Sequence, residues 1–126
     1  MVGLVVISHS SKIAEGIKEV ALQMAPNALI ECAGGTFDGE IGTDYNKIVN
    51  AIEKVYSKDG VIILFDLGSA VMNAEMAIEN LNDKDKIKIV KCAVVEGAIA
   101  AAVEASIGNS LDEIVENLKA LDINKA

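Results

Sequence analysis

The chain has a single histidine, His9, which follows the apolar residues 3–7 after one serine. Such a run is typical of a buried parallel strand, and residues 11–24 then carry apolar side chains at helical spacing. Open α/β sheets bind ligands at the carboxyl ends of their strands, and the free amides that open a helix favour an anion. Because histidine can take up a proton or a phosphoryl group near neutral pH, this position suits phosphoryl transfer. The alternative is a structural histidine that only caps the strand.

The composition limits both the fold and the partners. A chain of 126 residues is long enough for one domain with a substantial core, and we interpret residues 1–126 as a single domain. Hydrophobic residues make up 52% of the chain but aromatic residues only 3%, which favours an aliphatic core between a parallel sheet and its helices. The net charge of −8 argues against nucleic acid or an anionic membrane as a partner. The chain contains no arginine, so a phosphate would have to be held by amides, hydroxyls or lysine.

Targeting signals and metal motifs are not apparent in the sequence. No run approaches the ~20 apolar residues of a membrane span, and the first residues lack the basic region of a signal peptide. Cys32 and Cys92 lie in or beside apolar runs without a CxxC pair, so we interpret both as reduced core thiols. One histidine and two scattered cysteines do not form a metal site. We expect a cytoplasmic protein with no bound cofactor.

Four strand-like runs alternate with helix-like segments. The predicted strands span about residues 2–7, 28–32, 61–65 and 87–95. The first predicted helix spans residues 11–24, and the fourth runs from Glu96 to Ile107. The second begins after Thr43 or Asp44, the third begins after Ser69, and the fifth follows a capping box at Ser110 and Glu113. Met72 and Met76, one helical turn apart, are interpreted as core residues, and residues 124–126 as a frayed tail. This alternation predicts an α/β fold, an open parallel sheet with right-handed crossovers and helices on both faces.

The strand-to-helix junctions of such a sheet all lie at one edge. They read Ser8-His9-Ser10-Ser11, Gly34-Gly35-Thr36, Asp66-Leu67-Gly68-Ser69 and Glu96-Gly97-Ala98. If the strand order is 2-1-3-4, His9 lies between Asp66 and the glycine turn. Asp66 could then accept a hydrogen bond from one imidazole nitrogen and leave the other free as the nucleophile. The alternative for Asp66 is a helix cap, and the two roles can coexist.

Several residues around His9 are candidates for binding a phosphate through hydroxyls or amides. They are Ser10, Ser11, Gly34, Gly35, Thr36, Gly68 and Ser69. The alternative for each is an ordinary turn or helix cap. Glu96 is more typical of a helix cap than of a pocket, and Lys12, which we take to be the only lysine near the site, is more typical of a solvated side chain.

Five short motifs follow one another along nearly the whole chain. They are Val5-Val6-Ile7-Ser8-His9-Ser10, Ala33-Gly34-Gly35-Thr36, Ile41-Gly42-Thr43, Asp66-Leu67-Gly68-Ser69-Ala70 and Val95-Glu96-Gly97-Ala98. Each is weak alone, but the ordered set closely resembles the DhaM family, the phosphocarrier subunits of the phosphotransferase-system-dependent dihydroxyacetone kinase.

The resemblance implies a fold similar to the mannose-type enzyme IIA domain, a sheet in 2-1-3-4 order, and a dimer. It implies that His9 is the phosphorylated residue and that phospho-HPr is its donor. The phosphoryl group would then pass to ADP on the DhaL subunit, and the ATP so formed would phosphorylate dihydroxyacetone on DhaK. Some members of the family carry extra HPr-like and enzyme I-like domains, and this chain ends before such domains would fit, so we expect a separate HPr.

Three alternatives stay open. A mannose-type sugar-transporter enzyme IIA would share the fold and the chemistry but serve a permease. A small tetrapyrrole metal chelatase also ends its first strand in a histidine-serine turn, although such chemistry usually needs further ligands. A non-catalytic dimeric regulator would use His9 only structurally. The hydrophobic content of 52% and the positive mean hydropathy of +0.37 predict a homodimer. We expect its contact face to be an alanine-rich and methionine-rich surface away from the His9 edge.

Overall fold

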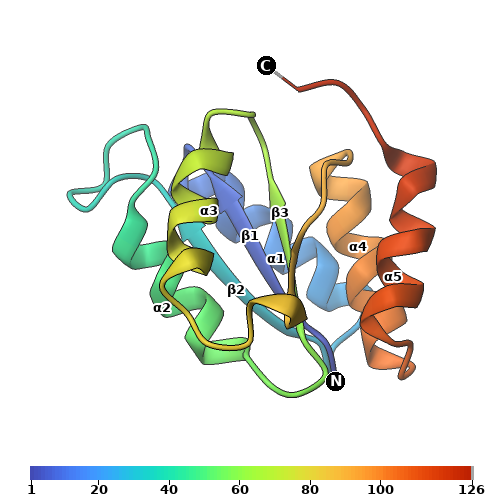
Figure 1. Ribbon diagram of the computed structural model, residues 1–126. Helices are drawn as coiled ribbons and strands as arrows, with labels where there is room; N and C mark the ends of the chain where they lie inside the picture. Colours follow the sequence, from blue (N-terminus) through green and yellow to red (C-terminus); the bar gives the residue numbers. More distant parts are fainter. Residues whose placement is uncertain (126) are drawn as a thin grey trace.

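The computed structural model describes residues 1–125 and contains a four-stranded parallel sheet with helices on both faces (Figure 1). The strands are β1 (Gly3–Ser8), β2 (Leu29–Gly34), β3 (Val61–Phe65) and β4 (Ile87–Ile89). The helices are α1 (Ser11–Met24), α2 (Tyr45–Val55), α3 (Ala70–Glu79), α4 (Val94–Ser106) and α5 (Leu111–Leu118), with short 3-10 turns η1 (Lys84–Lys86) and η2 (Lys119–Leu121). The strand order is β2-β1-β3-β4, so the predicted fold class and order are confirmed.

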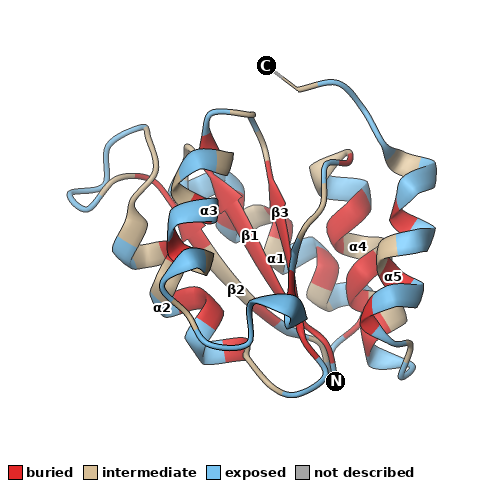
Figure 2. Ribbon diagram, in the orientation of Figure 1, coloured by how far each residue is buried: buried red, intermediate tan, exposed pale blue. Residues whose placement is uncertain are grey.

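The two faces of the sheet bury separate hydrophobic cores. Leu4 and Val6 of β1 belong to the core under α1, α4 and α5, whereas Val5 and Ile7 belong to the core under α2 and α3. Every residue of β1 and β3 is buried, as Figure 2 shows for the centre of the sheet. This two-sided burial explains why both strands are continuous apolar runs rather than alternating ones.

The register of the central strands determines where the polar junctions lie. Ile7 of β1 pairs with Ala33 of β2 on one side and with Phe65 of β3 on the other. The chain that follows each of these three strands therefore emerges at one edge of the sheet, as predicted. His9 lies at the end of the middle strand.

The fourth strand is shorter than predicted. β4 ends at Ile89 rather than near residue 95, and α4 begins at Val94 rather than at Glu96. The amide of Val90 still donates to the Ile63 carbonyl (3.0 Å), but the chain then leaves the sheet. Residues 90–93 connect the sheet to α4, and Val94 and Val95 form the start of that helix. Hydrophobicity alone does not separate such residues from a continuing strand.

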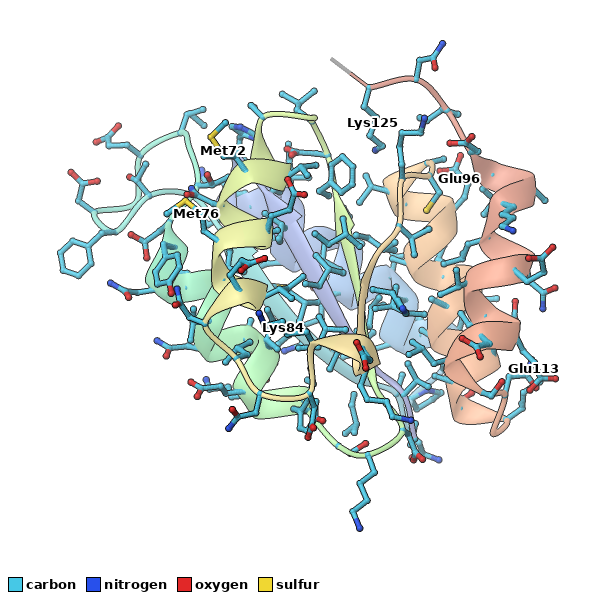
Figure 3. All side chains as sticks on the ribbon, viewed as in Figure 1. Met72, Met76, Lys84, Glu96, Glu113 and Lys125 are labelled. Atoms are coloured by element: carbon cyan, nitrogen blue, oxygen red, sulfur yellow. The ribbon has the colours of Figure 1, made fainter. Side chains whose placement is uncertain are left out.

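Two predicted helix faces are also wrong in part. The buried positions of α3 are Ala70, Ala74 and Ala77, so Met72 and Met76 lie on its outer side, 72% and 52% exposed (Figure 3). On α1 the buried side consists of Ala14, Ile17 and Ala21, whereas Ile13, Val20 and Met24 are exposed. In both helices, most buried positions are alanines, and several larger apolar side chains are left at the surface.

The remaining predictions concern the tail and the cysteines. Lys125, predicted to be frayed, contacts β3, and Ala126 lies outside the described residues. Cys92 is buried and Cys32 is half-buried, and both are free thiols. Burial, together with the charge of Glu15, raises the pKa of the Cys32 thiol to about 12. Within residues 1–125, no helix combines the length and apolar character needed to cross a bilayer.

Two helical glycines give a matched test of the packing between α4 and the sheet. A Cβ at Gly97 would lie 2.5 Å from the Cys92 sulfur and 3.4 Å from Leu64, whereas a Cβ at Gly16 meets nothing within 4 Å. We expect Gly97→Ala to lower the free energy of unfolding by about 1–3 kcal/mol through overpacking. Gly16→Ala, in contrast, should raise it by about 0.5–1 kcal/mol through helix propensity. Urea denaturation measures both, and equal effects of the two substitutions would contradict the packing argument.

Candidate active site

The imidazole of His9 is held between two side chains from the β3–α3 junction. Nδ1 lies 3.0 Å from Oδ1 of Asp66, and Nε2 lies 2.8 Å from the hydroxyl oxygen of Ser69. An ionised carboxylate can only accept, so Nδ1 carries the proton and donates it to Asp66. Nε2 then has the free lone pair and accepts from the Ser69 hydroxyl. The side chain of His9 remains 21% exposed, so the ring can be reached from solvent.

Asp66 receives four hydrogen bonds, more than a simple helix cap requires. Oδ2 accepts from the His9 amide and from the Ser8 hydroxyl, both at 2.9 Å. Oδ1 accepts from His9 Nδ1 and from the Leu67 amide (2.7 Å). Partial burial alone would raise the pKa of this carboxyl, but the hydrogen bonds from His9, Ser8 and Leu67 outweigh it and hold the pKa below the usual value. Asp66 is therefore ionised at neutral pH.

Ser8 belongs to this network, although sequence reasoning did not assign it a role. It is fully buried, and its hydroxyl donates to Asp66 and accepts from the Ser10 amide at 3.1 Å. This one hydroxyl links the end of β1 to β3 and to the start of α1. The available signal was a polar residue at the end of an otherwise apolar buried strand, where an unpaired hydroxyl would be costly.

Ser69 has an unusual position for a helix-capping residue. It is the N-cap of α3, but its side chain makes no capping hydrogen bond and contacts His9 instead. Ser10, in contrast, caps α1 by accepting from the Ile13 amide (3.4 Å). Two helices therefore begin beside the imidazole, and their N-terminal dipoles favour an anion there. Ser11 and Gly68 lie at these same helix starts.

The end of β2 and the turn after it are filled by contacts within the protein. A Cβ at Gly34 would lie 2.7 Å from the Ser11 Cα, so this glycine permits the close approach of α1. Gly35 has a φ of +76° and donates its amide to the Ser8 carbonyl (3.1 Å). The Thr36 amide and hydroxyl bind within the following loop, to Glu40 and Asp38. The predicted phosphate-binding role of these three residues stays a prediction.

The lysines near this edge differ from the one that the sequence suggested. Lys12 is exposed on the first turn of α1, and Glu96 is exposed on the first turn of α4, where Ala93 rather than Glu96 is the N-cap. Lys47 donates to the Gly34 carbonyl (3.0 Å), and Lys125 donates to the carbonyls of Phe65 and Asp66. Neither contact follows from sequence spacing. Among residues 1–125, no cluster of three or more histidine, cysteine or acidic side chains could hold a metal ion.

A parallel sheet in 2-1-3-4 order, with a histidine held by an aspartate at its carboxyl edge, is the arrangement expected of an enzyme IIA-type protein. The family model described as the PTS system fructose IIA component matches residues 3–115. The chain belongs to this EIIA-man family, and within it to the DhaM group that the following relatives represent.

Curated relatives carry the DhaM name. A phosphoryl donor subunit DhaM of PEP-dependent dihydroxyacetone kinase 1 from Listeria innocua is 38% identical, over 96% of this chain and 95% of the relative. The DhaM phosphotransferase subunit of Lactococcus lactis is 37% identical, over 98% of both chains. The Escherichia coli DhaM is 41% identical over 91% of this chain, which spans only 26% of that longer relative.

Solved structures share the fold. The crystal structure of a protein of unknown function has a TM-score of 0.84 at 32% identity and covers 98% of this chain and 96% of its own. A sigma-54 interaction domain protein from Enterococcus faecalis has a TM-score of 0.73 at 19% identity, covers 94% of this chain and 88% of its own, and shows the fold alone.

The network around Asp66 predicts a pH-dependent contribution to stability. Because the pKa of Asp66 is lower in the folded state than its ordinary value of 3.8, the carboxylate contributes stability above that value and loses it as the pH falls below it. We expect the difference in unfolding free energy between the wild type and Asp66→Asn to be largest near pH 7 and to shrink between pH 4 and lower values. Urea denaturation at a series of pH values measures this. If the difference in unfolding free energy stayed constant with pH, the ionised state assigned to Asp66 in the folded protein would be contradicted.

Proposed function

We propose that this protein is a histidine phosphocarrier that takes a phosphoryl group onto Nε2 of His9 and passes it to ADP. The observation that carries the proposal is the orientation of the ring, with Nδ1 bound to Asp66 and Nε2 beside a hydroxyl that can turn away. Relatives named as phosphoryl donor subunits of dihydroxyacetone kinase support the same reading.

The loading step is a displacement at phosphorus. The Nε2 lone pair of His9 attacks the phosphorus of a phosphohistidine donor, the donor's P–N bond breaks, and its electron pair returns to the donor imidazole. Positive charge develops on the His9 ring as the new bond forms, and the ionised Asp66 stabilises that charge through Nδ1–H. The Ser69 hydroxyl leaves Nε2 and donates to a phosphoryl oxygen, and the starts of α1 and α3 supply further partial positive charge.

The unloading step runs the same chemistry in the other direction. A terminal phosphate oxygen of ADP attacks the phosphorus, the P–Nε2 bond breaks, and the electron pair returns to His9. We propose HPr as the donor, ADP on DhaL as the acceptor and DhaK as the subunit that holds dihydroxyacetone, all in the cytoplasm and with no cofactor bound by this chain. The acidic surface, with its net charge of −8, favours partners with a basic docking face.

Exposed apolar side chains near the site support docking by other proteins. Leu67 is 46% exposed beside Asp66, and Phe37 and Ile41 are exposed in the loop whose Gly42 amide donates to the His9 carbonyl at 2.8 Å. Met72 lies on the outer side of α3 (Figure 3). Apolar residues around a functional group are typical of surfaces that partners cover in turn.

The central experiment is phosphorylation followed by intact mass. Incubation with phosphoenolpyruvate, enzyme I and HPr should add one phosphoryl group, because His9 is the only imidazole. The adduct should be labile in acid and stable in alkali, and His9→Ala should take up none while keeping its far-UV circular dichroism. Uptake by His9→Ala would overturn the assignment of the residue, and no uptake by the wild type would favour the chelatase or the regulator.

A second measurement separates dihydroxyacetone kinase from sugar transport. The phosphorylated protein should lose its phosphoryl group on addition of DhaL with ADP, and ATP should appear. Loss only to a sugar permease would instead assign the protein to the sugar-transporter enzymes IIA.

We further propose a homodimer formed through the last two turns of α1. Val20 and Met24 are 48% and 63% exposed there. The helix of 14 residues is about 20 Å long, so an interface at its far end leaves His9 open. We propose this location instead of the alanine-rich and methionine-rich surface expected from the sequence, because most alanines of α4 are buried and the exposed Met72 lies on α3, the helix that begins beside His9.

Light scattering at low micromolar concentration tests the dimer. The wild type should have the mass of two chains, and Val20→Lys should have the mass of one, because a charge would be buried in the contact. Asn50→Lys, which places the same charge on an exposed position of α2, should remain dimeric. A monomeric wild type contradicts the dimer, and a dimeric Val20→Lys contradicts this interface.

A further inference from the structure

The last described residues cross the carboxyl edge of the sheet and end on β3. After α5 and η2, the Ala93 amide donates to the Leu121 carbonyl (2.9 Å), and Lys91 forms an ion pair with Asp122 (3.5 Å). The chain then runs to Lys125, whose side chain points back toward the end of β3 (Figure 3). This path places a residue from the end of the sequence against the junction that holds the His9 ring.

The ammonium of Lys125 replaces a missing strand partner. In a parallel sheet, alternate residues of a strand direct their carbonyls to the same neighbour. The Ile63 carbonyl accepts from Val90, but β4 ends there and its chain leaves the sheet before it reaches Phe65. Lys125 Nζ donates to the Phe65 carbonyl at 2.8 Å, so a side chain provides the hydrogen bond that this carbonyl at the end of β3 would otherwise lack.

Two further contacts fix the same ammonium group. Nζ donates to the Asp66 carbonyl at 3.2 Å and lies 5.1 Å from the centre of the Phe65 ring, a cation–π distance. Burial lowers the pKa of Lys125, while the negative charge of Asp66 acts in the opposite direction. Lys125 is thus bound to the peptide groups on both sides of the Asp66 Cα.

We propose that Lys125 is a positioning residue for phosphoryl transfer at His9. It holds the β3–α3 junction from the side opposite to His9, so that the Asp66 carboxylate and the Ser69 hydroxyl keep their alignment with the imidazole. Its charge also offsets part of the negative charge that accumulates when a phosphoryl group lies near an ionised Asp66. The effect on transfer rests on the proposed function, whereas the effect on the ring does not.

The first test reads the imidazole directly. His9 is the only histidine, so its two ring nitrogens give unambiguous ¹⁵N signals. The wild type should show the Nδ1–H form, with Nε2 unprotonated. Lys125→Ala should give a mixture of the Nδ1–H and Nε2–H tautomers of the neutral ring, because Asp66 is no longer held in place. Lys125→Arg should restore most of the wild-type signal.

The second test measures the rate of phosphoryl uptake from phospho-HPr. We expect Lys125→Ala to slow uptake about tenfold, the size expected from a small misplacement of the reacting groups. Asp66→Asn, which changes the contact itself, should slow it by about 10²-fold. Lys125→Arg should recover most of the rate. Lys119→Ala is the matched control, because it removes the same charge from an exposed site on η2, where Lys119 pairs with Glu116 and with no other side chain among residues 1–125. It should leave both readouts unchanged.

The outcomes separate the positioning role from the carrier function. If Lys125→Ala keeps the wild-type tautomer and rate, the positioning role is wrong and the carrier function stands. If the wild type takes up no phosphoryl group but Lys125→Ala shifts the tautomer, the carrier function is wrong and Lys125 still positions the ring. If Lys125→Ala loses stability, Lys125→Met takes its place, because it keeps the length of the side chain but has no donor and no charge. A wild-type tautomer and rate in that variant overturn the positioning role, and a mixed tautomer with a slowed rate supports it.

Discussion

The site depends on the carboxylate of Asp66, because it joins two parts of the chain that are distant in sequence, the end of β1 and the β3–α3 junction. Its four donors come from the end of β1, from His9 itself and from the start of the loop before α3. The parallel register brings the ends of β1 and β3 together, and the carboxylate then orients the ring. A partly buried charge tolerates this position only because each oxygen is satisfied. Loss of one donor would therefore affect the ring and the sheet edge together.

In the proposed carrier, an acidic chain without arginine has to hold a phosphoryl group in an unusual way. The positive potential at the edge comes from helix dipoles, hydroxyls and lysine contacts with backbone carbonyls rather than from a guanidinium clamp. Such a cradle stabilises the transferred group less than bidentate ion pairs would. Weaker binding is appropriate for a carrier, because binding the group equally tightly before and during transfer does not make the transfer faster. The phosphoryl group must also be able to leave.

Features encoded by local patterns could be predicted, and features that depend on long-range packing could not. Two apolar runs buried on both faces fixed β1 and β3 as central strands, and the Ser110 capping box was correct. The end of β4 was wrong because an apolar helix start reads like a continuing strand. The glycines after β2 carry no local sign that helix α1 fills the space above Gly34. Lys125 was missed because its partner lies 60 residues away and the tail has no pattern of its own.

The two helices that begin beside His9 are fixed in different ways, and this difference bears on how the site works. The start of α1 is locked by packing, because a Cβ at Gly34 would lie within 3.0 Å of Ser11, Ser10 and Ala14. At the start of α3, Ala70 is buried in the core, but the residues just before it reach the ring through hydrogen bonds, from the Asp66 carboxylate and the exposed Ser69 hydroxyl. Close packing resists displacement, whereas hydrogen bonds to an exposed serine can be exchanged. The Ser69 hydroxyl must leave Nε2 before a phosphoryl group can bind there. The hydroxyl that has to move therefore lies at the start of α3, where contacts can be exchanged, whereas the packed start of α1 keeps the backbone next to His9 in place.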